Sequence, residues 1–177
     1  MAKKLAISGI FISMALVLSF FEGMIPVNFG VPGVKLGLAN IVTLTALFVL
    51  GPLYAIAIQI GRVILAALMF GNMAGLLYSL AGGILSIFAM VALFKLRKPV
   101  FSIIGLSAAG AVFHNIGQIL TASAVVNDLR LAYYLPILML SGVATGIFVG
   151  LVSKYLIKGL IKTKYIDIKN PYAIDRL

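Results

Sequence analysis

The sequence contains no cysteine and no tryptophan, and it has one histidine and four acidic residues in 177 positions. Without cysteine, the chain forms neither disulfides nor thiolate metal sites. A single histidine argues against a metal centre built from protein side chains, and no cofactor is indicated. The acids, Glu22, Asp128, Asp167 and Asp175, are too dispersed to hold magnesium for prenyl or phosphoryl transfer. No glycine-rich phosphate loop ends in Lys-Ser or Lys-Thr, so we do not expect ATP hydrolysis or any other catalysis.

Charge is also scarce, because only 10% of the residues are charged while 63% are hydrophobic. The mean hydropathy of +1.19 lies far outside the range of soluble domains. A membrane-spanning helix needs about 20 mostly apolar residues, so the length predicts one compact all-α bundle of six transmembrane helices. We expect a single membrane domain over residues 1–177, with spans at about 5–21, 34–50, 53–70, 76–94, 101–125 and 131–152 and a basic tail at 153–177.

The basic residues follow this topology, which explains the net charge of +10 without a nucleic-acid partner. One side of the predicted bundle carries Lys3, Lys4, Lys95, Arg97, Lys98, Lys154, Lys158, Lys162, Lys164, Lys169 and Arg176. The other side carries only Lys35 and Arg130. The positive-inside rule therefore predicts that both termini are cytoplasmic, with the tail against anionic headgroups of the bilayer.

The first apolar run shows no clear cleavage site, and we interpret it as a retained span. Small residues share one face of it, at spacings of four, three and four: Ala2, Ala6, Gly9 and Ser13. Such a face lets another helix approach closely. It either packs inside the chain's own bundle or docks on a separate membrane subunit, and the sequence does not separate these alternatives.

Glycine and proline mark the other packing and turn features. The segment 22–35 is too rich in both for a continuous helix, and it is either a lid over the bundle or an ordinary interfacial loop. Gly82 and Gly83 in the fourth span permit a kink or close packing. Gly142, Gly146 and Gly150 recur every fourth residue in the sixth span, as in membrane helices that pack closely.

Polar residues inside the predicted spans identify a candidate binding site: Lys35, Asn40, Gln59, Arg62, His114, Asn115 and Gln118. Arg62 lies near the middle of a span, where a charge is costly and a function is expected. Of the acids, only Glu22 can reach this site, so an anionic ligand is one candidate partner for Arg62. The alternative is a structural network in which these groups satisfy one another. His114 is more typical of a hydrogen-bonded structural residue than of a general base.

Two stretches, Lys35-Leu36-Gly37-Leu38-Ala39-Asn40 and His114-Asn115-Ile116-Gly117-Gln118, carry a resemblance to a known group. With the small-residue first span and Gly51-Pro52, the chain resembles the substrate-capture (S) components of energy-coupling factor (ECF) vitamin transporters. More narrowly, it resembles the Gx transporter family, whose members are often labelled heptaprenyl diphosphate synthase component I. The resemblance implies a subunit of the prokaryotic plasma membrane that takes a small molecule from the outer face. It also implies docking through the small-residue face on a coupling membrane subunit driven by an ATPase pair. Riboflavin-type members have an acid shortly after the loop lysine, where this chain has Gly37 and Asn40.

These observations leave three functions open, and none is enzymatic. The first is an S-component-like subunit that captures a small anionic or amphipathic molecule of the vitamin, flavin or isoprenoid and quinone-precursor class. The second is a non-catalytic membrane subunit associated with heptaprenyl diphosphate or quinone synthesis. The third is a bundle that anchors another membrane complex, in which neutralising Arg62 would change only stability.

Overall fold

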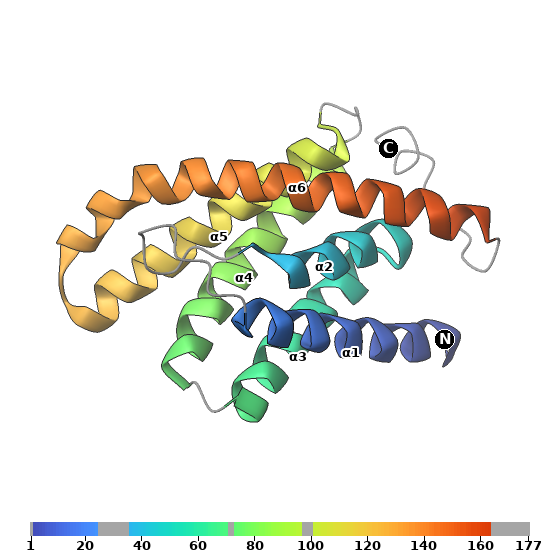
Figure 1. Ribbon diagram of the computed structural model, residues 1–177, viewed down its shortest axis with the longest axis horizontal. Helices are drawn as coiled ribbons and strands as arrows, with labels where there is room; N and C mark the ends of the chain where they lie inside the picture. The colour runs from blue at the N-terminus through green and yellow to red at the C-terminus, as the bar shows by residue number, and fades with distance from the viewer. Residues whose placement is uncertain (1, 25–35, 71–72, 97–100, 164–177) are drawn as a thin grey trace.

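The computed structural model describes residues 2–24, 36–70, 73–96 and 101–163 and is all-helical there, as the sequence predicts (Figure 1). A 3₁₀ segment, η1, precedes the last helix. The elements are α1 (Ala2–Met24), α2 (Leu38–Val49), α3 (Pro52–Phe70), α4 (Met73–Lys95), α5 (Ile103–Val126), η1 (Leu129–Tyr134) and α6 (Leu135–Lys162).

Five of these helices are long and apolar enough to cross a membrane: α1, α3, α4, α5 and α6. Their outer faces expose many large apolar side chains, such as Leu68, Leu120 and Leu140, which suits contact with lipid rather than water. The chain is therefore a multi-pass membrane protein.

The sixth apolar helix, α2, differs from the predicted span at 34–50 because it begins only at Leu38. Gly37 has a φ of 76° and Gly51 a φ of 97°, a left-handed conformation that interrupts a helix on either side. The 12 residues between these turns extend about 18 Å, which is less than the roughly 30 Å of a hydrocarbon core. Pro52 then begins α3, where its missing N–H costs no hydrogen bond.

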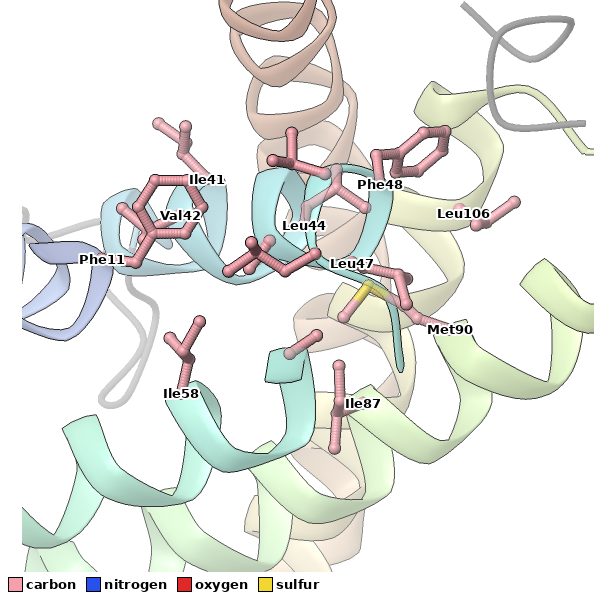
Figure 2. Packing of buried hydrophobic residues seen from close by; sticks show 14 of the residues in the cluster. Phe11, Ile41, Val42, Leu44, Leu47, Phe48, Ile58, Ile87, Met90 and Leu106 are labelled. Atoms are coloured by element: carbon pink, nitrogen blue, oxygen red, sulfur yellow. The ribbon is translucent and has the colours of Figure 1, made fainter. Parts of the chain in front are cut away.

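Despite its length, α2 forms the centre of the bundle, and ten of its residues are buried. It lies between α1 and α6 and also contacts α3 (Figure 1). Figure 2 shows Leu44 and Leu47 of α2 among side chains from the surrounding helices, including Ile58 of α3 and Ile87 of α4. Since protein surrounds α2 on every side, its apolar composition reflects burial in the protein core.

Close glycine contacts join α4, α5 and α6. A methyl group on Gly146 would lie 2.6 Å from the Cα atom of Ala108, and one on Gly117 would lie 2.8 Å from the Cα atom of Gly82. The predicted stripe of Gly142, Gly146 and Gly150 is therefore the surface on which α6 packs against α5. At Gly82 and Gly83 the helix α4 continues without interruption, so these glycines serve close packing.

The last span also differs from its predicted bounds of 131–152. Residues 129–134 form η1, and α6 begins at Leu135 with a proline in its first turn. The helix continues to Lys162, as the helical spacing of the lysines predicts, while residues 164–177 lie outside the described part of the chain.

Candidate functional site

A cavity of about 140 Å³ lies inside the bundle, and residues of all six α-helices line it. Its wall is unusually polar for the interior of a membrane protein. The polar lining residues are Ser19, Glu22, Asn40, Arg62, Ser79, Ser86, Ser107, His114, Asn115, Gln118 and Thr145.

Arg62 on α3 is the cationic group among the described residues of this wall. Its Nη2 donates a hydrogen bond to Asn40 Oδ1 at 2.8 Å, and its Nε donates to Gln59 Oε1 at 3.0 Å. Gln59 Oε1 also accepts a hydrogen bond from Thr43 Oγ1 at 2.8 Å. Asn40 and Thr43 are three residues apart on α2, as are Gln59 and Arg62 on α3, so each pair shares a helical face and the two faces meet.

Gln59 lies behind the cavity wall and holds Arg62 and Thr43 in place through its Oε1. Only 2% of the residue is exposed, and it does not line the cavity. Its Nε2 lies against Gly83 of α4, where a side chain on residue 83 would collide with the amide. The glycine therefore makes room for the group that orients Arg62.

A guanidinium group has five N–H donors. In the described part of the chain, two of the N–H groups of Arg62 donate hydrogen bonds, both to oxygens of neutral side-chain amides. The remaining donors and the positive charge are therefore available to an acceptor in the cavity.

Glu22, the acid that the sequence places within reach, does line the cavity. Its Oε1 accepts a hydrogen bond from the backbone N–H of Gly37 at 2.5 Å, which ties the end of α1 to the start of α2. The carboxylate acts on Arg62 through space, but the described residues form no salt bridge between them. Glu22 therefore does not occupy the donors of Arg62.

The polar face of α5 forms another wall. His114, Asn115 and Gln118 all line the cavity, and the backbone carbonyl of His114 packs against Gly82 of α4. Asn115 Nδ2 donates to the carbonyl oxygen of Leu138 at 2.5 Å, which links α5 to α6. This wall therefore presents the imidazole ring of His114 and the neutral side-chain amides of Asn115 and Gln118, all of which can form hydrogen bonds.

The structure thus brings together five of the seven predicted site residues on one cavity: Asn40, Arg62, His114, Asn115 and Gln118. Gln59 contacts Arg62 from outside it. Lys35, together with residues 25–35 of the predicted lid or loop, lies outside the described residues. A binding role for these residues remains a prediction.

Sequence reasoning missed the hydroxyl groups of the cavity. Ser107 precedes His114 by seven residues and Gln118 by eleven, and so shares their face of α5. Ser79 and Ser86 are seven residues apart on α4, which also places them on one face. This periodicity could have identified them, but serine in a membrane helix often bonds only to its own backbone.

A second, more open hollow of about 380 Å³ lies between α1, α3 and α4. Apolar groups such as Phe20, Val63 and Leu76 form much of its wall. Arg62 borders both spaces, together with Ser19, Gly23 and Ser79. The arginine therefore lies where the polar cavity meets a more apolar hollow.

The small-residue face of α1 is exposed at Ala2, Ala6, Gly9 and Ser13. The helix packs on the bundle through Phe11 and Ala15 instead, and a methyl group on Gly9 would meet nothing within 4 Å. Packing of this face within the described bundle, one of the two alternatives for it, is therefore wrong. Docking of a separate subunit there remains a prediction.

In the comparison with known families, residues 11–156 match the family model described as heptaprenyl diphosphate synthase component I. The match confirms the resemblance to proteins carrying that label. No curated protein matches the chain, and no solved structure matches it. Within the ranges described above, no three His, Cys, Asp or Glu side chains are grouped so that they could hold a metal ion.

Proposed function

The chain belongs to the heptaprenyl diphosphate synthase component I family, and from that premise we propose that it is a membrane-embedded substrate-binding subunit. In this proposal it captures a small anionic or amphipathic molecule in the cavity beside Arg62. The subunit binds its substrate without transforming it, since the four acids of the whole chain are dispersed.

One observation carries the proposal: Arg62 borders a polar cavity with donors that the described protein atoms leave unused. A buried cation is costly unless an anion or several acceptors compensate it. Its two protein acceptors are neutral, and the Glu22 carboxylate is engaged at Gly37. A carboxylate or phosphate group of a ligand would complete the hydrogen bonding of Arg62 with charge-assisted bonds.

We further propose that this subunit acts in an ECF-type transporter and takes its substrate from the outer face of the prokaryotic plasma membrane. The exposed small-residue face of α1 is suited to close approach of a coupling membrane subunit, which an ATPase pair would drive. The first residues of α1 and the last turns of α6 lie toward the same end of the bundle (Figure 1), which supports two cytoplasmic termini.

A second candidate is a non-catalytic membrane subunit associated with heptaprenyl diphosphate or quinone synthesis. The name of the family refers to heptaprenyl diphosphate synthase, and an apolar hollow opens beside Arg62. In this case the same cation would hold a diphosphate while the apolar part of the molecule lies in the hollow.

Identification of the partner separates the two candidates. We would express the tagged chain in its native membrane, cross-link and purify it, and identify the captured proteins by mass spectrometry. A coupling membrane protein with ATPases supports the transport subunit, whereas a soluble, acid-rich prenyl transferase supports the second candidate.

Variants of α1 test docking through the small-residue face. A Gly9→Leu variant should lose the coupling subunit, while an Ile10→Leu variant, changed beside the small-residue face, should retain it. Equal capture by both variants would contradict docking through this face.

A further inference from the structure

Two serine hydroxyl groups line the cavity wall and form no hydrogen bond with the described residues. Ser86 on α4 and Ser107 on α5 are each only 4% exposed, and both line the cavity. No described residue forms a hydrogen bond with either side chain. The buried hydroxyls of Thr43, Thr45 and Ser153 donate to protein oxygens. The hydroxyl of Ser123 also has no partner among the described residues, but it does not border the cavity.

Buried polar groups usually have a hydrogen-bond partner, because leaving one unsatisfied is costly. Alanine would fill the same positions in the core without that cost. The two serines therefore indicate a partner that enters the cavity from outside the protein.

These hydroxyls lie at the end of the cavity away from Arg62. Ser79 borders both hollows together with Arg62, and Ser86 follows it by two helical turns, or about 10 Å along α4. Across from Ser86, a methyl group on Gly110 of α5 would lie 3.2 Å from the serine Oγ. Ser107 lies one turn before Gly110 on the same helix. The serine end of the cavity is thus neutral, whereas the other end carries Arg62 and Glu22.

The volume of the cavity limits what can lie between the two ends. About 140 Å³ is close to the roughly 150 Å³ of an engineered protein cavity that holds benzene. A single ring with small substituents fits this space. A three-ring flavin or a long isoprenoid chain does not fit in this cavity alone and would have to extend into the neighbouring hollow.

We propose, on the basis of the function proposed above, that the substrate is a compact, ring-sized molecule with one anionic group and one neutral hydrogen-bonding group. The anionic group binds at Arg62. The neutral group, a hydroxyl, carbonyl or ring amide, binds at Ser86 and Ser107, because serine donates and accepts hydrogen bonds without carrying charge.

Three probes of defined chemistry test the proposal: benzoate, 4-hydroxybenzoate and farnesyl diphosphate. The dissociation constant of each follows from the dependence of the melting temperature of the purified protein on probe concentration. We expect 4-hydroxybenzoate to bind about five-fold more tightly than benzoate, which corresponds to one neutral hydrogen bond, and farnesyl diphosphate to cause no stabilisation.

The Ser86→Ala, Ser107→Ala double variant should lose the preference for the hydroxylated ring and bind both benzoates equally. The matched control is Ser123→Ala, which changes a buried serine of α5 that does not line the cavity. It should retain the preference. Each single serine variant provides the same comparison if the double variant does not fold.

An unchanged preference in a serine variant would overturn the proposal, as would stabilisation by farnesyl diphosphate or by neither ring compound. Arg62→Ala separates this proposal from the one on which it rests. If Arg62→Ala weakens binding of both benzoates but the serine variants keep the preference, the anion site stands and the neutral site fails. If Arg62→Ala binds both as the wild type does, the anion site itself fails.

Discussion

Arg62 Nη2 donates a hydrogen bond to Asn40 Oδ1 at 2.8 Å, which joins the middle of α3 to the first turn of α2. The partner is a neutral amide, so the bond orients the guanidinium group without neutralising it. An acid at position 40 would have formed a salt bridge and compensated the cation within the protein. The asparagine instead leaves the charge for a molecule in the cavity.

Asn40→Asp tests this relationship. The new carboxylate should pair with Arg62, so we expect the melting temperature to be retained or raised. The affinity for an anionic ligand should fall at least about ten-fold, because the loss of a charge-assisted contact with Arg62 costs more than about 1.4 kcal/mol. Binding and thermal unfolding are measured on the same detergent preparation. Asn127→Asp, the same change at the end of α5 and outside the cavity wall, is the control. Unchanged affinity in Asn40→Asp would contradict anion binding at Arg62.

Gln59→Leu should be more destabilising than Thr43→Val. The leucine removes the acceptor of the buried Thr43 hydroxyl and of the half-buried Arg62 Nε, at a cost of about 2–3 kcal/mol in the free energy of unfolding. In Thr43→Val, Gln59 Oε1 keeps its bond to Arg62, and the cost should be about 1 kcal/mol. Reversible unfolding in mixed micelles gives both values. The opposite ranking would show that Gln59 is not the centre of this network.

Two glycines that look alike in sequence should respond differently to alanine. Gly146→Ala places a methyl group 2.6 Å from the Cα atom of Ala108, and neither backbone can yield easily. We expect a loss of about 2–3 kcal/mol, as for overpacked cores. Gly9→Ala meets nothing within 4 Å and should be neutral or stabilise α1 by up to about 1 kcal/mol. Equal effects on the melting temperature would contradict the packing of α6 on α5.

The sequence predicts much of the bundle, because hydropathy and charge reveal long helices directly. It does not show where α2 begins, since the apolar residues around Gly37 suit either a membrane span or a turn. The left-handed conformation of Gly37 depends on its surroundings, including the bond from its N–H to Glu22. For the same reason the predicted span begins at residue 34, whereas the helix begins at Leu38.

The candidate site was predictable to the extent that charge and helical spacing define it. Arg62 and Gln59 are conspicuous in an apolar helix, and their three-residue spacing predicts their contact. The serines of the cavity were not found, because a membrane-helix serine bonded to its own backbone looks the same in sequence as Ser86 or Ser107. Only the arrangement of α4 and α5 shows that these hydroxyls face a cavity.

Asp128, at the start of η1, should titrate below the ordinary range of an aspartate. Its carboxylate accepts hydrogen bonds from the side chain and then the backbone N–H of Arg130, which lower its pKa. The stabilisation from this pair is present above the ordinary pKa of about 3.9 and is lost as the pH falls through the lowered value. Carbon NMR of the labelled carboxyl group should show the low pKa in the wild type and a rise in Arg130→Ala. A wild-type pKa at or above the ordinary value would contradict the pairing.

Native mass spectrometry of the protein in mild detergent tests anion capture at Arg62 most directly. The wild type is compared with Arg62→Ala and with Arg130→Ala, which removes an arginine that is 84% exposed and paired with Asp128 outside the cavity. We predict a bound small anion on the wild type and on Arg130→Ala, and its loss from Arg62→Ala. Retention of the same adduct by Arg62→Ala, or no adduct on any of the three proteins, would contradict anion capture and favour a bundle that anchors another complex.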